Sequence, residues 1–141
     1  MTSAVFDTNV IVSGFLSPDG PPGRIVEWLR GGTVQAVLDD RVAAEYTEVL
    51  ARPRFGLPSG EVDIVLAAIR LGAVRVEVGP QDRAAGLPDP DDAPFLECAR
   101  AAGVPVVTGN LRHYPKSAAR AVAVLAPAQF VARLAREASR R

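Results

Sequence analysis

The sequence has 141 residues, of which 48% are hydrophobic and 23% are charged, and its formal net charge is zero. This length and composition are ordinary for a globular unit, and we expect residues 1–141 to form a single domain. The zero net charge argues against a strongly basic RNA-binding module, so polyanion binding would need a local basic patch or a metal ion.

The sequence also lacks the patterns that are typical of exported and membrane proteins. No run approaches the roughly 18 consecutive apolar residues of a membrane helix, and the N-terminus does not resemble a signal peptide. We therefore expect a cytoplasmic protein with no membrane contact. Cys98 is the single cysteine, which excludes an intrachain disulfide, and we expect it to pack inertly within a helix.

Apolar runs, helical spacing and turn residues predict the elements of the chain. The first half contains, in order, a strand at Ala4–Phe6, a helix at Asn9–Leu16, a turn at Ser17–Gly23, a helix at Arg24–Arg30, a strand at Val34–Leu38, and helices at Asp39–Arg52 and Ser59–Leu71. The second half contains a strand at Val74–Val78, a loop at Gly79–Pro90, a helix at Asp91–Ala102, strands at Val104–Val107 and Val122–Leu125, and a helix from Pro127. This alternation predicts a three-layer α/β/α sandwich with a mainly parallel sheet of about four to five strands.

Polar side chains follow several of these predicted strands, at the edge where open α/β sheets bind ligands. Asp7 comes directly after the first strand, and Asn110 comes three residues after Val107. Glu45 lies early in the helix after the second strand, and Asp92 lies in the first turn of its helix. Both acids border apolar helix faces, where an acid costs free energy unless a partner or a metal binds it. The pattern favours a metal site.

Each of these residues also has a purely structural interpretation. Asp7 could simply begin a turn, and Glu45 could be an ordinary acid on a helix surface. Asp91 or Asp92 could cap the following helix, where a carboxylate suits the free backbone N–H groups. Asn110 could supply only turn geometry after a glycine. The residues alone leave both interpretations open.

Three acids and one amide oxygen form the hard-oxygen ligand set that Mg²⁺ and Mn²⁺ prefer. Such an ion can polarise a phosphodiester and activate water for its hydrolysis, and RNA cleavage with a 3′ oxygen leaving group would give a 5′-phosphate end. The sequence contains neither a Walker-type phosphate loop nor a Rossmann glycine fingerprint. Ser-His-Asp catalysis could use only His113, the sole histidine, and no serine lies in a nucleophile-elbow motif.

Four short motifs, in order along the chain, carry a resemblance to a known family. They are Val5–Ser13, Glu45–Leu50, Asp89–Leu96 and Val107–Asn110. Together they resemble the PIN-domain family over nearly the whole chain. The Asp89–Leu96 motif, with Leu50–Pro53 before it, is similar to the toxin-type (VapC-like) branch, which belongs to toxin–antitoxin systems.

The resemblance implies a metal-dependent endoribonuclease whose metal and catalytic residues are Asp7, Glu45, Asp92 and Asn110. Asp92 is the favoured direct ligand, and Asp91 is a further candidate that could bind the metal directly or through water. Asn110 stands where many members have aspartate, and its neutral amide should hold a second ion more weakly. The resemblance also implies RNA as the substrate, a homodimer, and an antitoxin protein that occupies the active-site groove.

Four further residues are candidates for substrate binding. Thr8 and Thr108 could hold ligands or a phosphate through their hydroxyls, or could only cap helices and turns. Arg112 and Lys116 belong to a basic stretch next to Asn110 that could contact an RNA backbone, or could be an ordinary solvated surface.

Two other functions compete with the endoribonuclease interpretation. One is another metal-dependent phosphoryl hydrolase or DNA nuclease, although haloacid-dehalogenase phosphatases require an aspartate two residues after the first, where this chain has Asn9. The other is a catalytically weak fold of the same family that binds RNA or protein, which Asn110 and the zero net charge favour. The melting temperature with and without Mn²⁺ distinguishes a metal-dependent enzyme from the binding module. A bound metal stabilises the folded state, so no shift would favour the binding module.

Overall fold

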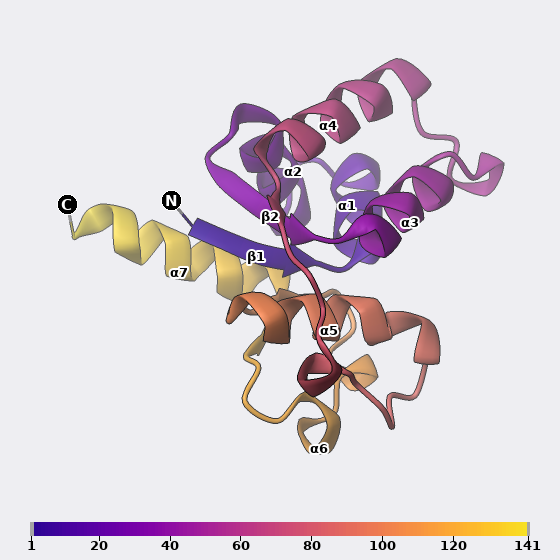
Figure 1. Cartoon of the computed structure of the whole chain (residues 1–141). Coiled ribbons are helices and arrows are strands. Elements are labelled where there is room, and N and C mark those ends of the chain that lie inside the picture. Colours follow the sequence, from indigo (N-terminus) through magenta and orange to yellow (C-terminus); the bar gives the residue numbers. More distant parts are fainter. Residues whose placement is uncertain (1, 141) are drawn as a thin grey trace.

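A five-stranded, all-parallel sheet forms the centre of the computed structural model, which describes residues 2–140. Its strands are β1 (Thr2–Phe6), β2 (Val34–Leu38), β3 (Val74–Arg75), β4 (Val106–Val107) and β5 (Val124–Leu125). Their order across the sheet is β3-β2-β1-β4-β5, so β1 lies in the middle (Figure 1). The end of β1 is fully buried, as expected for a parallel strand that is covered on both faces.

Helices cover both faces of this sheet. They are α1 (Thr8–Leu16), α2 (Pro21–Gly31), α3 (Asp40–Leu50), α4 (Ser59–Gly72), α5 (Ala93–Ala102), α6 (Lys116–Ala119) and α7 (Pro127–Ser139). Figure 1 shows α1, α2 and α4 on one side of the sheet and α5 and α6 on the other. The predicted three-layer α/β/α architecture is confirmed. Within residues 2–140, none of the helices is long and apolar enough to cross a membrane.

The register of the sheet brings the ends of β1 and β4 together. Phe6 pairs with Val107, and the N–H of Asp7 donates to the Val107 carbonyl over 2.9 Å. Thr108 continues the pairing, because its N–H donates to the carbonyl of Leu125 in β5. The residues that follow β1 and β4 therefore emerge side by side at one edge of the sheet.

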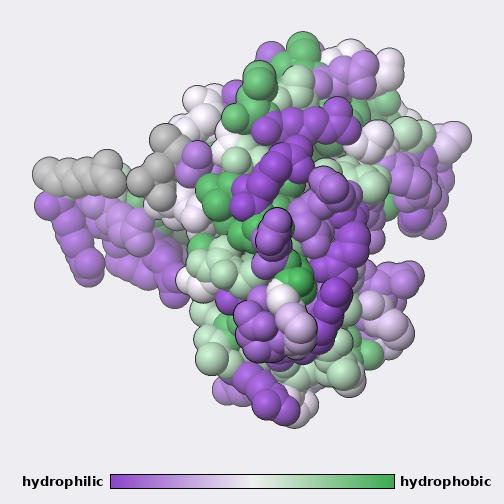
Figure 2. All heavy atoms as spheres, in the orientation of Figure 1, coloured by the Kyte–Doolittle hydropathy of each residue, from purple (hydrophilic) through white to green (hydrophobic). Residues whose placement is uncertain are grey.

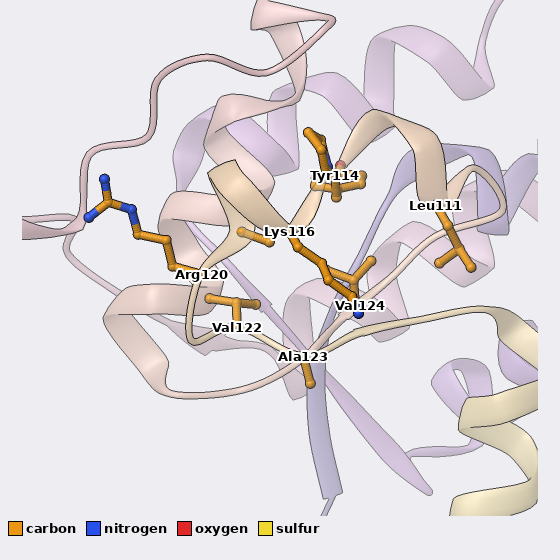
Figure 3. A pocket seen from close by; sticks show the side chains of 9 residues that line it. Leu111, Tyr114, Lys116, Arg120, Val122, Ala123 and Val124 are labelled. Atoms are coloured by element: carbon orange, nitrogen blue, oxygen red, sulfur yellow. The ribbon is translucent and has the colours of Figure 1, made fainter.

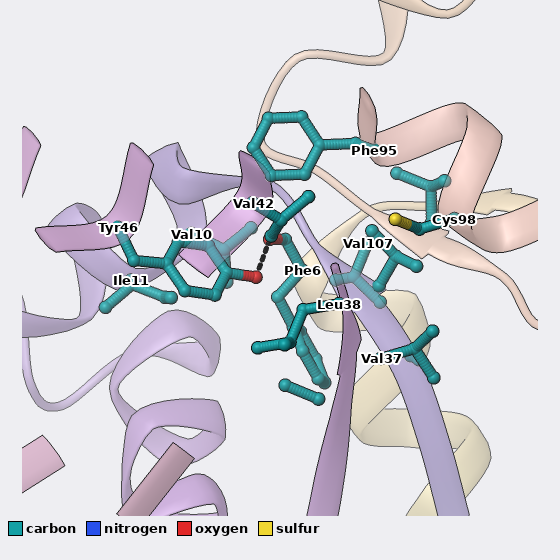
Figure 4. Packing of buried hydrophobic residues seen from close by; sticks show 14 of the residues in the cluster. Phe6, Val10, Ile11, Val37, Leu38, Val42, Tyr46, Phe95, Cys98 and Val107 are labelled. Carbon is teal, nitrogen blue, oxygen red and sulfur yellow. Dashed lines mark hydrogen bonds between the residues drawn. The ribbon is translucent and has the colours of Figure 1, made fainter. Parts of the chain in front are cut away.

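Aromatic side chains fix the helices to this sheet. Phe6 meets Phe130 of α7 edge to face, with ring centroids 5.5 Å apart, and Trp28 of α2 packs against the same Phe130. Tyr46 of α3 is buried, and its hydroxyl donates to the Phe6 carbonyl at the end of β1 (Figure 4). Aromatic pairs of this geometry add to the hydrophobic burial, and the Tyr46 bond holds α3 against the strand end that precedes Asp7.

The structure corrects several predicted boundaries. Helix α2 begins at Pro21, inside the predicted turn 17–23, because a proline in the first helical turn needs no acceptor for its nitrogen. Helix α5 begins at Ala93 rather than Asp91, because the Asp89 carboxylate accepts the Asp91 N–H and residues Pro90–Asp92 form a 3₁₀ helix. The strands β3, β4 and β5 are each shorter than predicted and retain two residues.

Two further differences concern α3 and the segment after β4. Helix α3 is shorter than the predicted 39–52, since Asp39 lies outside it as the cap and accepts the N–H groups of Arg41 and Val42. The 3₁₀ helix Leu111–His113 and the short α6 are not predicted at all. Both are too short to display the periodicity by which a helix is found in a sequence.

Cys98 of α5 is fully buried as a free thiol. Burial raises the pKa of this thiol to about 12, so it stays protonated at neutral pH. This is the inert packing position that the sequence predicts.

Candidate metal centre

Asp7 lies at the junction of β1 and α1, where it caps the helix by accepting the Asn9 N–H over 3.3 Å. Its Oδ2 accepts two more hydrogen bonds, from the Thr108 hydroxyl at 3.1 Å and the Tyr114 hydroxyl at 2.9 Å. Asp7 is only 5% exposed, and these donors hold its carboxylate in one orientation. Asp7 thus has a structural role as a helix cap, where the sequence suggests only the start of a turn, and its fixed carboxylate is also available as a ligand.

Glu45 approaches the same edge from the first half of α3. The Thr8 hydroxyl donates to its carboxylate. Burial raises the pKa of Glu45, and the hydrogen bond from Thr8 opposes that rise. The negative charges of Asp7 and Asp91 raise the pKa further. Glu45 therefore differs from an ordinary surface acid, because it faces other carboxylates.

Asp92 is presented by the 3₁₀ helix that precedes α5, and it is buried. Burial raises the pKa of Asp92 to about 6, and the negative charges of Asp7 and Asp89 act in the same direction. The Nδ1 atom of His113 lies 2.9 Å from Oδ2 of Asp92, and this contact only partly offsets the rise. Ionised Asp92 is therefore poorly compensated by the protein alone.

Asp7, Glu45 and Asp92 together form a carboxylate cluster that lacks a strong cationic side chain. The charge of Asp7 raises the pKa of both other acids, so Asp7 lies close enough to each of them to repel its ionised form. Within residues 2–140, no arginine or lysine forms an ion pair with any of them, and the one basic side chain that contacts them is His113. Hard oxygen ligands in this electrostatic setting fit a divalent metal ion.

A second potential ligand set shares one acid with this carboxylate cluster. Ligand atoms of Asp89, Asp92 and His113 all lie within 4.8 Å of one another. Neither Asp89 nor His113 is a predicted ligand. The signal for Asp89 is its place in the third motif, and His113 is the only histidine of the chain, three residues after Asn110. Asp92 therefore links two groups of donors.

Thr108 and Asn9 tie the two strand ends to each other. Thr108 is fully buried, and its hydroxyl, which donates to Asp7, accepts the Asn110 N–H at 3.1 Å and the Asn9 side-chain amide at 3.5 Å. The Asn9 side-chain oxygen accepts the Gly109 N–H at 3.0 Å. These bonds place Asn110 beside the carboxylate cluster. They also show that Thr108, like Thr8, holds an acid through its hydroxyl.

Tyr114 is a residue of the site that the sequence does not reveal. It is buried, and burial together with the negative charge of Asp7 raises the pKa of its phenol. The phenol therefore keeps its proton and donates a hydrogen bond to Asp7. The two residues are 107 positions apart, so no local pattern could connect them.

The remaining predicted residues lie at the rim of the site. Asp91, Arg112 and Lys116 are all exposed, with Arg112 in the 3₁₀ helix Leu111–His113 and Lys116 at the start of α6. In the part of the chain that the structure describes, none of the three forms an ion pair. Their charges are available to a ligand, and the roles of all the predicted site residues stay predictions.

The sequence also matches a model of a known family. That model is described as "PIN domain", and it matches residues 3–112, which is most of the chain. The match includes Asp7, Glu45, Asp92 and Asn110, whereas Tyr114 lies beyond its end. No curated protein matches the chain.

Proposed function

Because the chain belongs to the PIN-domain family, whose members are generally nucleases that use divalent metals, we propose that it is an endoribonuclease dependent on Mg²⁺ or Mn²⁺. The observation that carries this proposal is the carboxylate cluster of Asp7, Glu45 and Asp92. These acids lie at the carboxyl edge of a parallel sheet, where such folds bind their ligands. Burial and the negative charge of Asp7 raise the pKa values of Glu45 and Asp92, and none of the three acids forms an ion pair with an arginine or lysine within residues 2–140.

The acids would hold the ion, with Asn110 and Asp91 as further oxygen ligands. When bound, Mg²⁺ or Mn²⁺ supplies Lewis-acid polarisation of a phosphodiester and activates water as the nucleophile. Water would attack the phosphorus atom and the 3′ oxygen would leave, so that one product carries a 5′-phosphate. Asn110 lacks formal charge, which favours weaker binding of a second ion.

The chain's own hydrogen-bond donors prepare this site. Thr108 and Tyr114 orient the carboxylate of Asp7, and Thr8 does the same for Glu45. Removing a hydrogen-bond donor to a ligand carboxylate typically lowers metal affinity or activity by about 10–100-fold. The exposed side chains of Arg112 and Lys116 follow Asn110 and would contact the phosphates of the substrate.

A cleavage assay tests the proposal. Labelled RNAs and DNAs of matched sequence are incubated with Mn²⁺, Mg²⁺ or EDTA and with wild type, Asp7→Asn or Glu48→Gln, a control acid that is exposed on α3. We expect metal-dependent RNA cleavage with 5′-phosphate ends in wild type and Glu48→Gln, and none in Asp7→Asn. Cleavage of DNA alone would overturn the RNA assignment. No cleavage, together with no effect of Mn²⁺ on melting, would favour the RNA- or protein-binding module.

We propose further that the protein is a cytoplasmic toxin component of a toxin–antitoxin pair and forms a homodimer. The resemblance of the Asp89–Leu96 motif supports the toxin assignment. The exposed apolar residues Ile64 and Leu71, seven positions apart on α4, support a contact between two copies. Growth arrest on expression, relieved by a neighbouring gene, tests the first assignment. The mass in solution of wild type and Leu71→Glu tests the second.

A further inference from the structure

The zero net charge of the chain conceals two oppositely charged regions. Residues 98–141 contain one acidic residue, Glu137, and eight basic residues, a net charge of +7. Residues 1–97 carry the opposite charge, with eight basic and fifteen acidic residues. The basic residues of the C-terminal region are Arg100, Arg112, Lys116, Arg120, Arg133, Arg136, Arg140 and Arg141. A polyanion would be attracted to this region and repelled by the rest.

A first groove in this basic region shares one residue, Tyr114, with the carboxylate cluster. Its volume is about 480 Å³, and it is lined by Leu111, Tyr114, Lys116 and the apolar residues Val122 and Val124 (Figure 3). The Tyr114 hydroxyl donates to Asp7. The groove and the acids are therefore separated by a single side chain.

A second groove continues from the first on the other side of Arg120. Its volume is about 430 Å³, and Arg83, Arg100, Arg120 and Ser117 contribute polar lining. Arg120 and Val122 line both grooves. Figure 3 shows the Arg120 side chain pointing away from Lys116 and Val124, so Arg120, which borders both grooves, directs its guanidinium away from Lys116.

Arg100 is a fixed cation within the second groove. Its guanidinium donates to the carbonyl oxygens of Arg83 at 2.7 Å, Ala118 at 2.6 Å and Asp82 at 3.4 Å. In the described part of the chain no carboxylate forms an ion pair with Arg100 or Arg120, whereas Arg83 pairs with Glu97. Carbonyl oxygens orient a guanidinium without neutralising it, so Arg100 keeps a full charge for an anion.

Arg120 has a backbone conformation that an arginine rarely adopts. Its φ is 52° and its ψ is −117°, and among residues 2–140 it is the one non-glycine residue with a positive φ. Glycine adopts such angles without steric cost. Strained non-glycine residues of this kind concentrate at binding and catalytic sites, and here the strain directs a cationic side chain toward the second groove.

We propose that Arg100 and Arg120, assisted by Arg83, bind a backbone phosphate of the nucleic acid strand, away from the phosphodiester that is cleaved. Guanidinium groups can bind a phosphate with two parallel hydrogen bonds. The strand would run from the carboxylate cluster through the first groove to the second. This inference rests on the proposed function in that the ligand is a nucleic acid.

Binding of labelled RNA in EDTA, which prevents cleavage, tests the inference. Fluorescence anisotropy compares single-stranded RNAs of 4 and 16 nucleotides on wild type, Arg100→Gln, Arg120→Gln and the control Arg136→Gln, which removes an equal charge from α7. We expect Arg100→Gln and Arg120→Gln to weaken binding of the long RNA about five- to tenfold and of the short RNA by less than twofold. For both variants, the slope of log affinity against log salt concentration should decrease by about the amount that one phosphate contact contributes. Arg136→Gln should change both affinities by less than twofold.

Arg120→Gly separates the proposed role from a loss of folding. Glycine relieves the backbone strain, so the melting temperature should rise, whereas binding of the long RNA should fall as in Arg120→Gln. The inference would be overturned if both Arg120 variants bound the long RNA as tightly as Arg136→Gln does. This holds even if wild type cleaves RNA. Weakened binding by these variants without any cleavage by wild type would support the inference and contradict the nuclease proposal.

Discussion

Two buried acids at the two ends of one short segment, Asp92 and Glu97, have opposite electrostatic environments. Burial would raise the pKa of Glu97, but the Ala84 N–H and the Arg41 guanidinium bind its carboxylate and lower that pKa. Burial raises the pKa of Asp92 to about 6, and the neighbouring acid Asp7 adds to the rise. The protein itself supplies positive charge to Glu97, and it leaves Asp92 without an arginine or lysine partner.

The comparison separates a structural acid from a candidate ligand. Glu97 receives bonds from Arg41 at 2.8 Å, Arg83 at 3.3 Å and the Ala84 N–H at 3.0 Å, so it fastens the segment before α5 to the start of α3. Asp92 makes no comparable set of bonds to cations. Burial alone therefore does not distinguish a candidate metal ligand from a structural acid, whereas burial among like charges favours the candidate.

The largest expected effect is on catalysis, from removing the charge of Asp92. We predict that Asp92→Asn lowers metal-dependent RNA cleavage at least about 100-fold, because a ligand that supports several kcal/mol of transition-state stabilisation is lost. The metal-free variant should melt at the same or a higher temperature at pH 7, since ionised Asp92 destabilises the fold above its unfolded pKa of 3.8. Melting well below wild type would show that Asp92 is instead a structural acid.

The second largest expected effect is on stability, from removing the charge of Glu97. Glu97→Gln should lower the free energy of unfolding by about 1–2 kcal/mol, because the exposed side chains of Arg41 and Arg83 lose their charged partner. Urea denaturation measures this change. Mn²⁺ affinity of the folded variant should stay within a factor of about two of wild type. If Glu97→Gln were as stable as wild type but had lost its metal affinity, Glu97 would be a metal ligand and not a structural acid.

The third prediction concerns pH. A divalent ion held by the carboxylate cluster would bind the ionised form of Asp92, so the affinity for the ion should be highest above about pH 6. Below that value, protonation of the acid should lower the affinity by about tenfold per pH unit. Calorimetric titrations with Mn²⁺ between pH 5 and 7.5 measure this slope. Asp92→Asn is the control, and an unchanged slope in that variant would assign the titration to a different group.

The smallest expected effect is at the rim of the cluster. Asn110→Asp adds a charge beside Thr108, and we predict that it tightens Mn²⁺ binding several-fold, because a carboxylate is a stronger hard ligand than an amide. Titration of the variant against wild type at pH 7.5 is the measurement. Equal or weaker affinity would place Asn110 outside the metal's ligands and leave it as a turn residue.

The sequence predicts the fold better than the site. Apolar runs such as Ala4–Phe6 and the helix–strand alternation determine the parallel sheet, and the structure confirms it. Positions directly after strands can also be predicted, because the register of parallel strands places them at one edge. Asp7 and Thr108 meet in this way.

Contacts between distant segments could not be predicted. His113 ends a short 3₁₀ helix that has no periodic signal, and Tyr114 follows it, yet their side chains contact Asp92 and Asp7, respectively. The net charge is similarly uninformative about local patches, since a sum over the whole chain cancels the separate charges of residues 1–97 and 98–141. The contacts of Tyr114 and His113 depend on positions in space, which no local sequence pattern gives.

The most direct test of the carboxylate cluster as a metal site is calorimetric titration of Mn²⁺ into wild type, Asp7→Asn and Glu48→Gln at pH 7.5. We expect saturable binding of Mn²⁺ by wild type and Glu48→Gln, and at least about tenfold weaker binding by Asp7→Asn. Equal affinities in all three proteins would contradict it, because the bound ion would then lie away from Asp7.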